Sequence, residues 1–154
     1  MNEVNKDELA LDHCFWREIS TNRHFFNLFV GRSKFADGWI DLDRTEKWHQ
    51  RWFRDPETKL DSETDITLFL IDTREHRKYA IHIENKPAHG KWQPNQPENY
   101  KKRAENRMGK WKHDDYQTAL IAPQSFIDAH PEAVALFGFV VSYEEISPFV
   151  PEFG

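Results

Sequence analysis

The sequence contains a single cysteine, few glycines and no long apolar run. Cys14 therefore has no partner for an internal disulfide, and a lone thiol cannot build a multi-cysteine zinc site. The longest apolar stretch, around Ile66–Ile71, has the length of a strand and falls far short of the ~20 residues that a membrane span needs. Met1–Glu8 is polar and acidic, unlike a secretory signal. These absences predict a cytoplasmic protein without a membrane partner.

An overall excess of basic residues is also missing. The 154 residues carry a formal net charge of −5, which at first argues against a nucleic-acid partner. The charge is unevenly distributed, however, because the segment from Lys86 to His113 holds eight Lys and Arg against Glu98 and Glu105. A basic stretch on an acidic body fits a surface that faces phosphates. A solvated helix face rich in Lys and Arg has the same composition, and both interpretations remain open.

The spacing of apolar residues predicts an α/β fold, and the length fits one domain over residues 1–154. One helix is expected over Asp7–Val30, or two helices with a break near Ser20–Asn22, where Thr21 or Asn22 would cap the second. Trp48 and Trp52 stand at i and i+4, which favours a short helix over Thr45–Phe53. Further helices are expected over Asn99–Arg107 and Gln124–Leu136, and strands over Asp65–Asp72, Tyr79–Glu84, Tyr116–Ala122 and Phe137–Ser142.

Two carboxylates mark the ends of the first two of these strands. Asp65 begins one strand, and Glu84 lies 19 residues later, near the end of the next. In an antiparallel hairpin the start of one strand lies beside the end of the other, so both carboxylates reach one edge of the sheet. Strand alternation then gives one face to His82, Glu84 and Lys86, and the other face to Ile81 and Ile83.

Two converging carboxylates repel each other unless a cation lies between them. Oxygen ligands of this kind suit Mg²⁺ or Mn²⁺ better than zinc. Lys86 can reach the same point and hold an attacking water. The alternatives are that Asp65 caps a turn and that Glu84 and Lys86 form an ordinary salt bridge on a solvated edge.

Three short motifs follow one another in the order of a known family. They are Ile83-Glu84-Asn85-Lys86, then Gln93-x-x-Gln96-x-x-x-Tyr100, then Ser142-Tyr143-Glu144. Together with Asp65 this order resembles the PD-(D/E)XK nuclease superfamily, over roughly residues 62–146. The resemblance implies a restriction-endonuclease-like core, in which helices flank a central mixed sheet of four to five strands in the order αβββαβ.

The resemblance also implies roles for individual residues. Asp65, Glu84 and Asn85 would hold Mg²⁺, with Mn²⁺ as a substitute. Lys86 would serve the attacking water, Gln96 would support the site, and an acid from the N-terminal helix would complete it, Glu18 being the first choice and Glu8 the second. The residues expected to bind nucleic acid are Tyr100, Lys101, Lys102, Arg103 and Arg107.

The function implied by these features is Mg²⁺-dependent hydrolysis of phosphodiester bonds, with DNA as the expected substrate, by an endo- or exonuclease. A binding module that keeps the fold without turnover is the first alternative. A subunit of a restriction or phage-defence assembly is the second and rests on analogy of fold. A homodimer is compatible with each of these.

Overall fold

The structure is a computed structural model that describes residues 3–54, 61–87, 98, 105 and 113–154. For residues 3–9, 46–54 and 61–65 it describes the backbone. The helix expected over Asn99–Arg107 lies outside the described residues, apart from Glu105.

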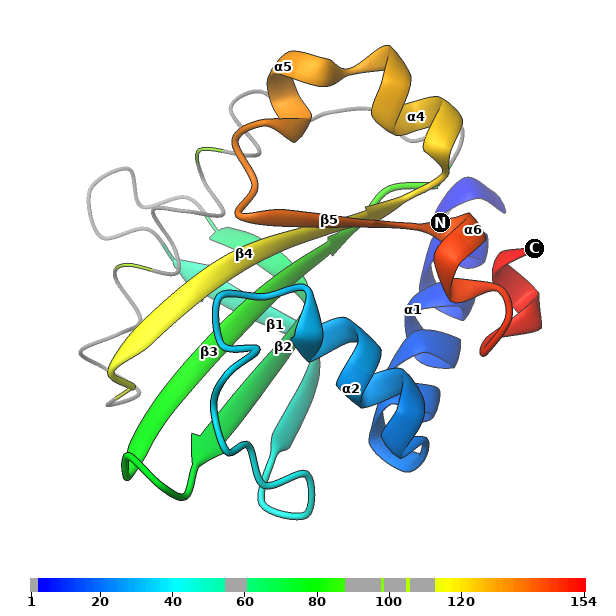
Figure 1. Ribbon diagram of the computed structural model, residues 1–154. Coiled ribbons are helices and arrows are strands. Elements are labelled where there is room, and N and C mark those ends of the chain that lie inside the picture. Colours follow the sequence, from blue (N-terminus) through cyan, green and yellow to red (C-terminus); the bar gives the residue numbers. More distant parts are fainter. Residues whose placement is uncertain (1–2, 55–60, 88–97, 99–104, 106–112) are drawn as a thin grey trace.

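The chain folds as an α/β structure in which helices flank a mixed sheet (Figure 1). Its elements, in chain order, are α1 (Glu3–Thr21), α2 (Arg23–Gly31), β1 (Glu46–Arg54), β2 (Asp61–Asp72), β3 (Arg77–Asn85), β4 (Asp115–Ala122), α4 (Gln124–Ala129), α5 (Pro131–Val134), β5 (Phe139–Ser142), α6 (Tyr143–Ile146) and the 3₁₀ helix η1 (Pro151–Phe153). All four expected strands are confirmed, with β2 and β3 extending beyond their predicted bounds. The helix expected over Gln124–Leu136 is present as two short helices, α4 and α5, divided before Pro131.

The five strands lie in the order β1-β2-β3-β4-β5. β1 and β3 run antiparallel to β2, whereas β4 runs parallel to β3 and β5 parallel to β4. The helix predicted over Thr45–Phe53 is wrong, because β1 occupies this segment and pairs with β2 along its length. The spacing of Trp48 and Trp52 misled the prediction, since residues four apart share a face in a strand as well as in a helix.

The first two helices are separate, which is one of the two arrangements that the sequence left open. Asn22 has an extended backbone and ends the run of α1, and its side-chain oxygen accepts hydrogen bonds from the backbone N–H groups of His24 and Phe25. These two donors have no partner inside α2, so the asparagine satisfies them as an N-cap. The turn sends α2 back along the same face of the sheet, so that both helices contribute to one core.

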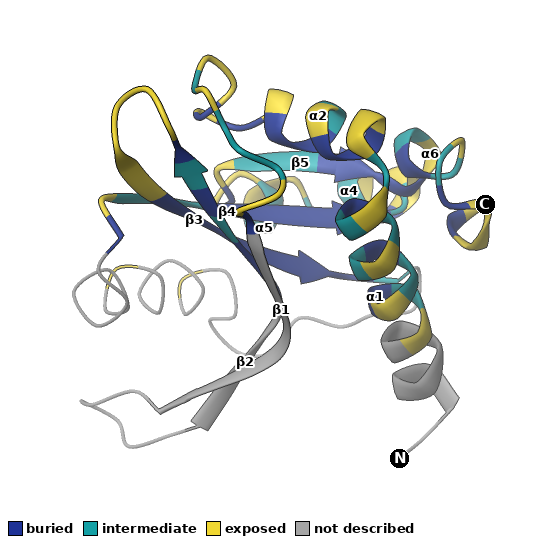
Figure 2. Ribbon diagram, turned by 90° about the horizontal axis from the view of Figure 1, so that it is seen from below, coloured by how far each residue is buried: buried dark blue, intermediate teal, exposed yellow. Residues whose placement is uncertain are grey.

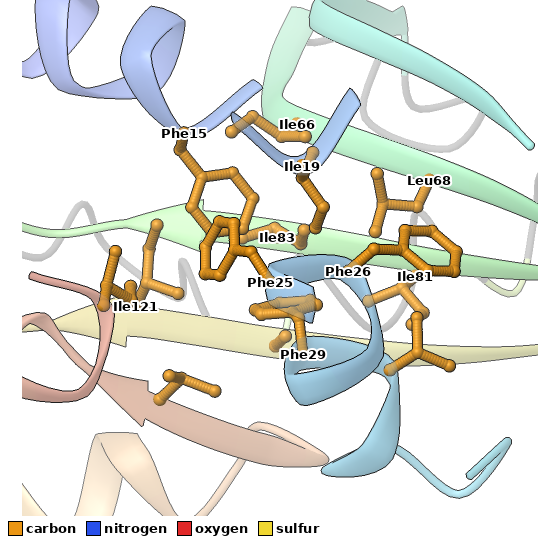
Figure 3. Packing of buried hydrophobic residues seen from close by; sticks show 14 of the residues in the cluster. Phe15, Ile19, Phe25, Phe26, Phe29, Ile66, Leu68, Ile81, Ile83 and Ile121 are labelled. Atoms are coloured by element: carbon orange, nitrogen blue, oxygen red, sulfur yellow. The ribbon is translucent and has the colours of Figure 1, made fainter. Parts of the chain in front are cut away.

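The main core lies between α1, α2 and the sheet (Figure 3). Phe15 is fully buried there, and its ring meets those of Phe25 and Phe29 edge-on at centroid distances of 5.3 Å each. The strands contribute Ile66 and Ile83, among other residues, from the same face. Aromatic pairs at this distance and angle add to the free energy gained from burial, and these pairs hold α1 against α2.

A second apolar cluster covers the opposite face of the sheet. It joins Leu120 and Ala122 of β4 to Phe126 of α4 and to Phe137. Since both faces are covered, β3 and β4 are buried over their C-terminal parts (Figure 2). None of the helices in the described ranges has the length and apolar character needed to cross a membrane.

Candidate active site

The candidate site lies where β3 ends between two neighbouring strands. The register pairs Ile66 of β2 with Ile83, and it pairs Glu84 with Leu120 of β4. Because β2 and β3 are antiparallel, the pair that follows Ile66 and Ile83 is Asp65 and Glu84. The backbone therefore places them opposite each other and on the same face. The side chain of Asp65 lies outside the described part of the structure.

Glu84 and Lys86 form a buried ion pair. Their side chains are 2% and 7% exposed, and Lys86 Nζ lies 3.5 Å from Glu84 Oε1. A carboxylate taken this far out of water is costly unless a positive charge and hydrogen bonds compensate it. The lysine supplies the charge, so the pair is distinct from the salt bridge on a solvated edge that the sequence left open.

The face that carries this pair is polar at its centre. Thr67 lies beside His82 across the β2–β3 ladder, and Thr118 lies beside it on β4. All three side chains are buried, with His82 only 1% exposed. Ile81 and Ile83 belong instead to the apolar core on the other face. The structure thus separates the alternating residues of β3 as the sequence predicted.

A second histidine borders the same face. The ring of His113 lies 6.3 Å from that of Phe69, which is two residues beyond Thr67 on β2. Burial lowers the pKa of the His113 imidazole, against the opposing influence of Asp114 and Asp115. This imidazole is therefore neutral at pH 7.

Asn85 points away from the ion pair. Its side chain is fully buried on the helix side of the sheet, where Nδ2 donates to Asp12 Oδ1 at 2.6 Å. The hydroxyl of Tyr143 donates to Asn85 Oδ1. Both polar ends of the amide thus face protein groups on that side. Metal ligation by Asn85, as the resemblance implies, would have to come from its main-chain carbonyl.

Asp12 is the acid that α1 brings to β3. It is 1% exposed and lies on the same helix face as the apolar residues Phe15 and Ile19. Glu18, the acid expected from this helix, is half-buried near the end of α1 and accepts a hydrogen bond from Asn22 Nδ2 at 2.8 Å. It stands six residues beyond Asp12, about 9 Å further along the helix axis. Glu8 is one turn before Asp12, where only the backbone is described.

The sequence contains a pattern that indicates a buried polar contact for Asp12. A carboxylate at position 12 falls on the apolar stripe of the helix, three and seven residues before Phe15 and Ile19. Charged residues are almost never fully buried without a partner, so an acid on such a stripe predicts a polar contact inside the protein. Tyr143 belongs to the motif Ser142-Tyr143-Glu144, but that motif does not indicate a hydrogen bond to Asn85.

Six of the expected site residues lie outside the described part of the structure. They are Gln96, Tyr100, Lys101, Lys102, Arg103 and Arg107. The basic stretch that they belong to remains an expectation from the sequence.

Where the structure describes the chain, no group of three His, Cys, Asp or Glu side chains is arranged to hold a metal ion. The described side chains do not include Asp65, which the register places beside Glu84. No family model matches the chain, and no curated protein or solved structure matches it either.

Proposed function

We propose that this chain is a metal-dependent nuclease with a restriction-endonuclease-like core, which hydrolyses phosphodiester bonds in nucleic acid, DNA being the expected substrate. The observation that carries the proposal is the buried ion pair of Glu84 and Lys86 at the end of β3. The backbone of Asp65 on β2 lies opposite Glu84 in the antiparallel register, on the same face of the sheet. Burying a carboxylate beside a lysine is a poor way to gain stability, since apolar residues of the same size do as well or better. A catalytic use explains the arrangement more economically.

The chemistry of the donors fits a divalent cation. Asp65 and Glu84 would supply carboxylate oxygens at one point of the sheet, and oxygen donors are the ligands that Mg²⁺ and Mn²⁺ take. Such an ion lowers the pKa of a bound water and neutralises charge on a phosphate. The residues named here suffice for that binding, together with solvent and phosphate oxygens.

Lys86 has a separate task in the proposed reaction. Hydrolysis forms a bond between a water oxygen and phosphorus and breaks the bond to the leaving sugar oxygen. The attacking water gives up a proton to solvent, and the leaving oxygen takes one up to become a hydroxyl. The Lys86 ammonium can orient the water and stabilise the added negative charge of the transition state. Its effect is strong because the side chain is only 7% exposed, so that little solvent screens it. Glu84 holds this ammonium in place in the resting protein.

The direct test is cleavage by the purified protein. Single- and double-stranded DNA, and RNA of the same sequence, would be incubated with Mg²⁺, with Mn²⁺ or with EDTA. We expect cleavage of at least one substrate with either ion and none in EDTA. Binding without cleavage under all conditions would favour the non-catalytic module instead.

Metal binding gives a second, independent test. A divalent ion that binds the folded state alone stabilises it by about 2.7 kcal/mol at 100 times its Kd, so saturating Mn²⁺ should raise the Tm by on the order of 5 °C. The matched variant is Asp65→Asn, which keeps the shape and removes one ligand charge. This variant should melt above the wild type without metal, because the repulsion is relieved, and gain little from Mn²⁺. Equal Mn²⁺ shifts in both proteins would locate the ion elsewhere.

A further inference from the structure

The buried side chains Asp12, Asn85 and Tyr143 form a continuous polar chain behind the candidate site, on the opposite face of β3 from Glu84 and Lys86. We propose that Asp12 and Tyr143 are positioning residues: they hold the amide of Asn85, and through it they fix the direction of its two neighbours. This inference rests on the proposed function and names how that site is aligned.

The contacts of Asn85 determine its orientation. The carboxylate of Asp12 accepts only, so it must face the amide nitrogen, and the 2.6 Å distance from Asn85 Nδ2 is short enough for a strong, charge-assisted hydrogen bond. The amide oxygen is then left to accept from the Tyr143 hydroxyl. Asn85 is fully buried, and its two partners are 1% and 7% exposed. Solvent does not compete for these bonds, so the amide has one well-defined orientation.

The partners come from separate elements on one side of the sheet. Asp12 belongs to α1, which the phenylalanine core fixes, and Tyr143 is the first residue of α6. A third support is the backbone bond from Lys86 N–H to the Ile121 carbonyl of β4, 2.9 Å long. The end of β3 is thus held through its side chain by two helices and through its main chain by a neighbouring strand.

Tyr143 is itself rigidly placed. Its ring meets Phe153 edge-on, with centroids 4.7 Å apart and planes at 90°. The short helix that it begins has a capping box, in which Ser142 Oγ accepts from the Glu145 N–H and Glu145 Oε2 accepts from the Ser142 N–H. Burial alone would raise the pKa of Glu145, but hydrogen bonds from Ser142 and Arg32 hold it below its usual value. The cap therefore stays ionised and intact at neutral pH.

The two hydrogen bonds from Asp12 and Tyr143 to the Asn85 amide, here called the clamp, affect the site through the geometry of the strand. Side chains of successive residues in a strand point to opposite faces. A rotation of the backbone at Asn85 therefore moves the side chains of Glu84 and Lys86 in the direction opposite to that of Asn85. A displacement of about 1 Å at reacting groups can lower a rate by about 100-fold. An asparagine suits the position because its amide both donates to a carboxylate and accepts from a hydroxyl.

The mildest test removes one hydroxyl. Tyr143→Phe keeps the ring against Phe153 and deletes the bond to Asn85. The matched control is Tyr79→Phe, the same change at a tyrosine of β3 that is 8% exposed and stacks on Phe35 away from the site. We expect Tyr143→Phe to lower kcat by about tenfold with KM for DNA unchanged, and to raise the Mn²⁺ concentration for half-maximal rate. Tyr79→Phe should leave all three at wild-type values.

A charge exchange tests the other bond of the chain. Asn85→Asp alone places two carboxylates against each other at the 2.6 Å contact and should lower kcat by about 100-fold. Combining it with Asp12→Asn again gives one amide facing one carboxylate, with an oxygen left for Tyr143. Recovery of kcat to within about threefold of wild type is expected for the pair. A residue that merely supported the fold would not show this reciprocal rescue at equal thermal stability.

The outcomes separate this inference from the proposed function. If the wild type cleaves and Glu84→Gln does not, but Tyr143→Phe matches Tyr79→Phe in kcat and Mn²⁺ dependence, the clamp is refuted and the nuclease stands. If the exchanged pair folds and stays as slow as Asn85→Asp, the Asp12 contact has no positioning role. If the wild type cleaves no substrate, the proposed nuclease function is refuted, and the positioning role of Asp12 and Tyr143 is refuted with it.

Discussion

Replacing Glu84 by glutamine is expected to lower the rate of metal-dependent cleavage by about 100- to 1,000-fold. The substitution preserves the shape of a side chain that is 2% exposed, but it removes the charge that would bind the cation and that faces Lys86 at 3.5 Å. Single-turnover cleavage of labelled DNA at saturating Mg²⁺ measures the effect on the chemical step, apart from product release.

The matched control for this prediction is Glu132→Gln, the same change at an exposed glutamate of α5. It should cleave at the wild-type rate. A Glu84→Gln protein that cleaves as fast as this control would show that the carboxylate takes no part in the reaction, and the proposed mechanism would have to be abandoned.

Replacing Lys86 by methionine is expected to lower the free energy of unfolding by about 3–5 kcal/mol in EDTA, because it leaves the Glu84 carboxylate buried without its counter-charge. Methionine has a similar length and apolar stem, so packing is largely retained. Combining Lys86→Met with Glu84→Gln removes both charges and should restore stability to within about 1 kcal/mol of the wild type. Urea denaturation of the wild type and the two variants measures these differences.

An exposed ion pair supplies the control for this second prediction. Lys34 Nζ lies 2.8 Å from Asp115 Oδ1, and both side chains are more than a third exposed, at 44% and 38%. Lys34→Met should therefore cost at most about 1 kcal/mol. If Lys86→Met lowers the free energy of unfolding no more than Lys34→Met does, the Glu84–Lys86 pair contributes to stability like a solvated salt bridge, and its burial has no effect on that contribution.

The parts of the fold that the sequence predicted correctly depend on local signals. Thr21 and Asn22 were the cap candidates because their side chains can accept from backbone N–H groups at a helix start, and Asn22 is the cap. The faces of β3 followed from strict alternation, which holds whatever the strand packs against. The antiparallel hairpin on which the expected convergence of Asp65 and Glu84 depends is confirmed, and continuing the β2–β3 register by one residue places their backbones opposite each other.

The parts that were missed depend on partners distant in the chain. β1 is a strand because β2 pairs with it, and its own sequence pattern fits a helix equally well. Asn85 and Asp12 are 73 residues apart, so nothing near either one indicates the bond between them. The motif Glu84-Asn85-Lys86 drew attention to its charged members, whereas the direction of its middle residue became clear only from the helices behind the sheet.

The position of Tyr143 in the chain has a consequence for biosynthesis. Asp12 leaves the ribosome well before Asn85, but Tyr143 follows Asn85 by 58 residues. At about 5–20 residues per second, the ribosome takes roughly 3–12 s to make that interval. Through this time the nascent chain holds Glu84 and Lys86 without the second half of their clamp. The proposed site thus acquires its alignment only after Tyr143 has been made, so a nascent chain that already contains both charged residues would not yet hold them in the proposed arrangement.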